Sequence, residues 1–146
     1  MQHDTAVAAV AHTIQLAVAP VFLLSGVGGM LAVLTSRLAR VVDRSRGLQT
    51  QLPATAPEAV AGIHEQLHTM ARRANLISHA IAYCTVTALL VCAVIVVLFV
   101  GAFVQFDASV PVALLFVAAM IALFIGLLSF LREIFIATAN LRIRPQ

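Results

Sequence analysis

The sequence predicts an all-α integral membrane protein with three transmembrane helices and a cytoplasmic antiparallel helical hairpin between the first and the second. Composition is the first observation: of 146 residues, 62% are hydrophobic and 10% are charged, whereas about a quarter of the residues of an average soluble domain are charged. The second observation is that the charges are clustered and leave three uncharged apolar stretches. Each stretch has about 20 residues or more, enough to cross a hydrocarbon layer of roughly 30 Å as a helix.

The predicted elements follow one another along the whole chain. They are an outer N-terminal segment (1–15), transmembrane helix 1 (16–35), the cytoplasmic hairpin (36–79), transmembrane helix 2 (80–104), an outer turn (105–109), transmembrane helix 3 (110–131) and a cytoplasmic C-terminal segment (132–146). The sequence leaves open whether residues 7–15 lie in the membrane or on its outer surface. Because Met1 to Thr5 contain no basic residue, we expect no cleaved signal peptide.

The orientation follows from the basic residues. All nine are arginines, and all fall on the same side of the three predicted spans. The acidic residues on the opposite side are Asp4 and Asp107, and His3 lies beside Asp4 at the N-terminus. The positive-inside rule therefore predicts a multi-pass protein of the bacterial cytoplasmic (inner) membrane, with its N-terminus outside and its C-terminus in the cytoplasm.

The hairpin is predicted from two heptad-like seams. Apolar residues at alternating spacings of three and four run along Leu31–Leu52 and again along Val60–Ile81, a pattern typical of helices that pack along each other. The stretch PATAP joins the seams, and its Pro53 and Pro57 interrupt a helix. Glu58 is favourably placed in the first turn of the returning helix. We therefore expect the first two helices to extend beyond the membrane and pair.

The returning helix also contains HEQLH, residues 64–68, which matches the H-E-x-x-H signature of zinc proteases. Two histidines four residues apart share a helix face, and the glutamate between them can act as general base on a zinc-bound water. No histidine follows six residues after His68, and Glu133 could serve as a third ligand only if the third helix docks against the hairpin. We interpret the motif as a solvated helix face. The sequence thus predicts no catalytic residue, cofactor or metal, with His64 and His68 as the remaining metal-ligand candidates.

Charged residues gather at the predicted inner ends of the spans. This cluster comprises Arg37, Arg40, Asp43, Arg44, Arg46, Arg72, Arg73, Arg132 and Glu133. One interpretation is anchoring to anionic head groups, worth about 1 kcal/mol for each basic residue. The other is an ordered ion-pair network that closes the cytoplasmic neck. Since anchoring alone would not favour an acid among arginines, we expect a paired, structural role for Asp43.

The first span contains a proline and several small residues. Those that bear on helix packing are Pro20, Ser25, Gly28, Gly29 and Ala32. Pro20 removes a backbone donor and can kink the helix, whereas the small residues allow a neighbouring helix to approach closely. Whether that neighbour belongs to the same chain or to a second copy is left open.

The same region resembles an uncharacterised bacterial membrane family, domain-of-unknown-function family 2721. The residues that carry the resemblance are Ile14, Ala19, Pro20, Ser25, Gly26, Gly28, Gly29, Arg37, Leu38, Arg40, Val42, Asp43, Arg44 and Arg46. The basic pair before the second span and the closing FLREIFIATANLRI are similar too. The resemblance covers nearly the whole chain and implies the three-helix architecture. It implies no activity.

Three classes of function are consistent with these features. We favour a non-catalytic, oligomeric membrane protein that acts as an interaction or accessory subunit through its cytoplasmic hairpin. Its partners would be a bilayer with anionic head groups and either further copies or a larger membrane complex, with no nucleic acid. The first alternative is an ion-conducting homo-oligomeric channel, by analogy of topology with proton-channel subunits, although no carboxylate lies mid-membrane. The second alternative is a zinc-dependent membrane hydrolase that uses HEQLH.

Overall fold

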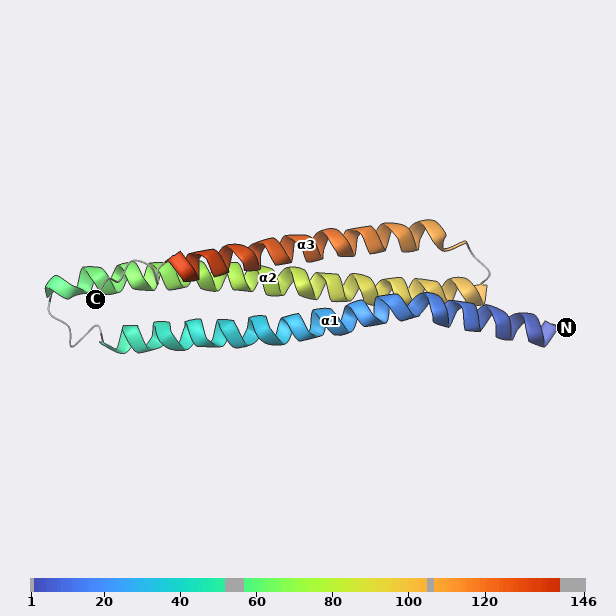
Figure 1. Ribbon diagram of the computed structural model, residues 1–146, viewed down its shortest axis with the longest axis horizontal. Helices are drawn as coiled ribbons and strands as arrows, with labels where there is room; N and C mark the ends of the chain where they lie inside the picture. The colour runs from blue at the N-terminus through green and yellow to red at the C-terminus, as the bar shows by residue number, and fades with distance from the viewer. Residues whose placement is uncertain (1, 52–56, 105–106, 140–146) are drawn as a thin grey trace. The chain divides into compact units, whose positions relative to one another are not determined.

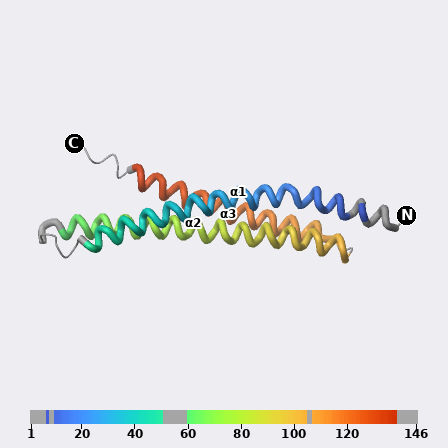
Figure 2. The backbone as a smooth tube through the Cα atoms, turned by 90° about the horizontal axis from the view of Figure 1, so that it is seen from below, coloured from blue at the N-terminus to red at the C-terminus, as the bar shows by residue number. Residues whose placement is uncertain are grey.

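Three long α-helices make up the described part of the chain. The computed structural model describes residues 2–51, 57–104 and 107–139, in which α1 spans Gln2–Gln51, α2 spans Pro57–Val104 and α3 spans Ser109–Ala139 (Figure 1). Figure 2 traces the same helices as a tube coloured by residue number. No strand occurs in these ranges, so the all-helical class predicted from the sequence is confirmed for them.

Each helix contains a stretch that is long and apolar enough to cross a membrane. These stretches lie within Val10–Thr50, Val60–Val104 and Ser109–Thr138. Between 17% and 22% of the most apolar window of each helix is buried inside the protein, and large side chains such as Phe22 and Phe103 are exposed. Soluble monomers rarely expose apolar surface on this scale. The three helices therefore indicate a multi-pass membrane protein.

The positions at which α2 and α3 begin have local causes. Pro57 is the first residue of α2, the position where its missing N–H costs no helical hydrogen bond. Pro53 lies outside the described residues. At the start of α3, one carboxylate oxygen of Asp107 accepts hydrogen bonds from the Ser109 hydroxyl at 2.6 Å and the Ser109 backbone N–H at 3.0 Å. The hydroxyl bond first, and the backbone bond second, hold the pKa of Asp107 below its ordinary value.

The helices continue through several of the predicted boundaries. Within its range, α1 includes part of the predicted outer segment (1–15), the predicted first span (16–35) and the predicted first arm of the hairpin. Pro20 lies inside α1 and is buried, and the helix continues past it. Similarly, α2 contains the predicted second arm of the hairpin and all of the predicted second span, 80–104. The positions of the membrane surfaces along these helices stay predictions.

The chain divides into two compact units, and each helix contributes to both. The first unit consists of Met1–Leu31 and Tyr83–Phe124. Its buried residues are mostly small or β-branched and include Thr13, Ala17, Val27, Cys84, Thr87, Val91, Val94, Ala119 and Ala122. The Thr87 hydroxyl lies 2.9 Å from the carbonyl oxygen of Tyr83 and 3.3 Å from that of Ala119. The hydroxyl therefore has an acceptor within α2 and also contacts the backbone of α3.

The second unit consists of Ala32–Ala82 and Ile125–Gln146. The described seam residues within Leu34–Leu48 and Val60–Ile81 are buried or half-buried, as residues on the packed face of a helix should be. The buried side chains also include one charged group, the carboxylate of Glu133 on α3. A buried charge is costly unless it is paired, so its surroundings define the candidate site.

Candidate functional site

Glu133 is bound by two arginines that come from the other two helices. Its Oε2 accepts a hydrogen bond from Nη2 of Arg37 at 2.8 Å. Its Oε1 accepts from Nη2 of Arg73 at 2.8 Å and from Nε of the same side chain at 3.2 Å. The Glu133 side chain is 0% exposed, while those of Arg37 and Arg73 are 28% and 23% exposed. One carboxylate thus joins α1, α2 and α3 within the second unit.

An aromatic ring on α3 also holds Arg37. The guanidinium carbon of Arg37 lies 5.3 Å from the centre of the Phe130 ring, within the range of a cation–π contact. Phe130 and Glu133 are three residues apart, so they share a face of α3. Phe130 was not predicted as a site residue, although its spacing of three from Glu133, the acid near the end of the third span, was a usable signal.

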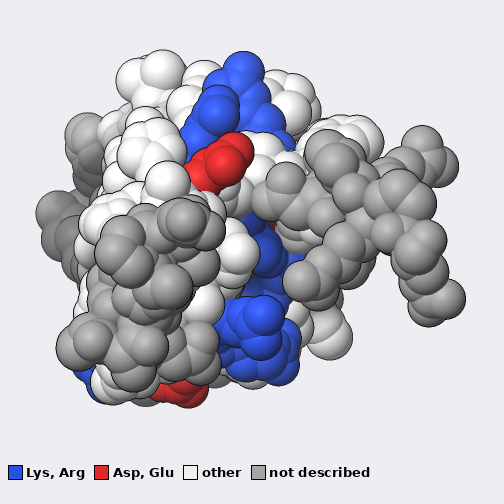
Figure 3. Space-filling model, turned by 90° about the vertical axis from the view of Figure 1, so that its left-hand side faces the viewer, with Lys and Arg blue, Asp and Glu red and all other residues white. Residues whose placement is uncertain are grey.

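The ion pairs border a cavity of about 320 Å³. The residues that line it are Arg37, Arg40, Val41, Arg44, Met70, Arg73 and Glu133. Figure 3 shows basic side chains gathered at a hollow in the face turned toward the viewer. Arg40 and Arg44 are exposed, and Nη1 of Arg40 donates to the Ser36 hydroxyl at 3.2 Å. Arg44 has no hydrogen bond or ion pair within the described parts of the chain.

The remaining members of the predicted cluster lie apart from this arrangement. Asp43, Arg46, Arg72 and Arg132 are exposed, and none of them lines the cavity. In the described ranges none of them forms an ion pair. The acid that pairs with arginines in the structure is Glu133, whereas a paired role was expected for Asp43. Glu133 lies 96 residues from Arg37 and 60 from Arg73 along the chain.

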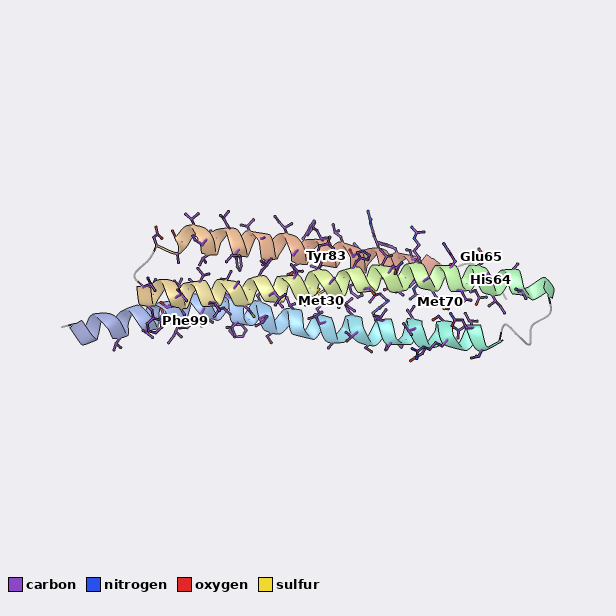
Figure 4. The ribbon with its side chains drawn as sticks, turned by 180° about the vertical axis from the view of Figure 1, so that it is seen from behind. Met30, His64, Glu65, Met70, Tyr83 and Phe99 are labelled. Carbon is purple, nitrogen blue, oxygen red and sulfur yellow. The ribbon has the colours of Figure 1, made fainter. Side chains whose placement is uncertain are left out.

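The histidines of HEQLH border a second cavity of about 390 Å³ in the same unit. Figure 4 labels His64 and Glu65 on α2, with Met70 farther along the helix. Nδ1 of His64 lies 2.9 Å from the Val60 carbonyl oxygen; since a carbonyl only accepts, this nitrogen carries the proton. Both histidines and Glu65 are exposed. Among the described residues, no group of three or more His, Cys, Asp or Glu side chains is placed to hold a metal ion.

The small residues predicted for helix packing separate into two sets. Pro20 is buried in the first unit, whereas Ser25, Gly28 and Gly29 of that unit are exposed. A Cβ atom added at Gly28 or Gly29 would meet nothing within 4 Å. Ala32, which belongs to the second unit, is exposed as well. The glycines are therefore not packing positions within the described chain.

Helical architecture, three apolar spans and a buried glutamate paired with two arginines define a class of multi-pass α-helical membrane protein. The family model described as "Protein of unknown function (DUF2721)" matches residues 17–143. The chain belongs to this family, which confirms the resemblance seen in the sequence. Neither the curated proteins nor the solved structures contain a match to the chain.

Proposed function

We propose that this chain is a non-catalytic protein of the bacterial cytoplasmic membrane that self-associates through α1 and acts as an interaction or accessory subunit. The observation that carries the proposal is the open small-residue face of α1. Ser25 and Gly29 are four residues apart and exposed, and a Cβ at Gly29 would be free of contacts. Membrane helices associate through such pairs of small residues, because their backbones can approach closely.

The neighbouring side chains support the same face. Val18 and Phe22 are exposed on α1 in the same unit, and with Ser25 and Gly29 they give spacings of three or four residues. This is a second seam, separate from the residues of α1 that are buried in the protein. A second copy would cover apolar side chains and backbone that the described chain leaves open.

The proposed orientation places the N-terminus outside and the helical hairpin of residues 36–79 in the cytoplasm. It is supported by the nine arginines on one side of the spans. The hairpin is the proposed contact for a further membrane subunit, and anionic head groups would attract its arginines. The exposed side chains of Glu65, His68 and Arg72 offer polar groups to such a partner.

The molar mass of the full chain in a mild detergent tests self-association. We expect a symmetric homo-oligomer for the wild type and a monomer for Gly29→Leu. A Cβ at this exposed position meets nothing within 4 Å, and leucine has a better helix propensity than glycine by roughly 1 kcal/mol, so the monomer should keep its fold. Ala118→Leu, at an exposed small residue of α3 in the same unit, is the matched control and should leave the mass unchanged. A monomeric wild type would refute the interface, and so would an equal fall in molar mass for Gly29→Leu and Ala118→Leu.

A further inference from the structure

The arginine cavity carries a large excess of positive charge. Four guanidinium groups and one carboxylate line a space of about 320 Å³, which leaves three positive charges uncompensated. Among the described residues, the hydrogen bonds to Glu133 come from Arg37 and Arg73, and none comes from Arg40 or Arg44. The charge of Arg40 and Arg44 therefore remains available to a ligand.

Two of the four guanidinium groups are already held in place. Arg37 is fixed by Glu133 and by the Phe130 ring, and Arg73 is fixed by two hydrogen bonds to Oε1 of Glu133. Each arginine has five N–H donors, so both keep donors that Glu133 does not use. Donors that are ordered before binding lower the entropic cost of binding a ligand.

We propose that this cavity is a binding site for one phosphate group, in which Arg40 and Arg44 bind the phosphate directly and Glu133 positions Arg37 and Arg73 beside it. A phosphate offers several oxygens to several guanidinium groups at once, and the planar donor fork of arginine matches that geometry. The volume lies at the small end of the range for ligand pockets, which fits a single phosphate-bearing group. The phosphate is either a free anion or the head group of an anionic lipid.

This site differs from general attraction between arginines and an anionic membrane. General attraction depends on charge near the surface and would treat the arginines alike. A discrete site requires the arginines that line the cavity. Arg46 and Arg132 are also exposed but lie outside it, so they provide controls with the same change of charge.

The experiment measures binding by calorimetric titration of the full chain in a maltoside detergent at constant ionic strength. One arm uses inorganic phosphate balanced against chloride, and the other uses a short-chain phosphatidic acid. We expect the wild type to bind at least one of these probes. Losing one charge-assisted contact should weaken binding about tenfold or more, so we expect this loss for Arg40→Gln and Arg44→Gln. Arg46→Gln and Arg132→Gln should bind like the wild type.

The two probes also distinguish the sources of the phosphate. Binding of inorganic phosphate supports a site for a free anion, and binding of phosphatidic acid alone supports a lipid head group. Because Arg40 and Arg44 take no part in the ion pairs with Glu133, their substitution should leave the helical circular dichroism spectrum unchanged. The proposal is overturned if neither probe binds above the chloride background, or if Arg46→Gln weakens binding as much as Arg44→Gln.

Discussion

Replacing Glu133 by glutamine should destabilise the second unit more than any other removal of an acidic group among the described residues. The side chain is 0% exposed and joins two arginines through three hydrogen bonds. Glutamine keeps one acceptor oxygen but turns an NH₂ group toward one of the guanidinium groups. Arg37 and Arg73 then lose their counter-charge while still largely enclosed.

The magnitude follows from burial. Removing one member of a buried ion pair costs about 3 to 5 kcal/mol, whereas exposed pairs are worth about 0 to 1 kcal/mol. Because the two arginines are 28% and 23% exposed, water compensates part of the loss, and we take the lower end, about 3 kcal/mol. For a chain of this size that corresponds to a fall in Tm of roughly 6 to 12 °C.

The assay is thermal unfolding of the detergent-solubilised protein, followed by circular dichroism. Asp43→Asn is the matched control, since it also neutralises an acid of the second unit but removes an exposed one; its effect should stay within about 1 kcal/mol. The double variant with Arg73→Gln should lose less stability than the two single variants together, because the second change removes an arginine that the first left unpaired. Equal, small shifts for Glu133→Gln and Asp43→Asn would refute the reasoning.

Three further outcomes are expected. Cysteines placed at Ser109 and at Thr55 should react with an impermeant reagent from opposite faces of the membrane, and labelling of both from outside would exclude the three-span arrangement. Purified protein should hold no stoichiometric zinc, and Glu65→Gln should change no phenotype; tightly bound zinc that is lost on His68→Ala would contradict this. An NMR titration should give Asp107 a pKa below its ordinary value, and removing the hydroxyl in Ser109→Ala should raise it. Because this pKa is lower in the folded protein, the carboxylate stabilises the start of α3 above the ordinary pKa, and that contribution is lost as the pH falls through the lowered one.

Much of the fold could be predicted because it depends on local patterns. Uncharged runs of about 20 residues are read directly from the sequence, and the described helices contain them. The alternating spacings of three and four indicated which residues lie on the packed face of each helix. Leu34, Val41 and Ile77 of those seams are buried. Such patterns need no knowledge of distant residues.

The site could be predicted only in part, because its partners are distant in sequence. Asp43 is close to four arginines along the chain, yet it is exposed. Glu133 is far along the chain from Arg37 and Arg73, and tertiary packing brings it to them. Helix periodicity gives the face of each residue, but it does not say which faces of three helices meet. For the same reason, the sequence identified the small residues of α1 without showing that their face is open.

The proposed oligomer and the proposed phosphate site use different residues, and this separation can be tested. Gly29 belongs to the first unit, and a Cβ added there would meet nothing within 4 Å among the described residues. Every residue that lines the phosphate cavity belongs to the second unit of a single chain, so the site is complete without a second copy. Gly29→Leu should therefore abolish self-association and leave the affinity for the phosphate probe unchanged. Arg44→Gln should lower the affinity for the probe and leave the molar mass of the protein unchanged. If the monomeric variant also stops binding the probe, a second copy completes the cavity, and the assignment of the site to one chain fails.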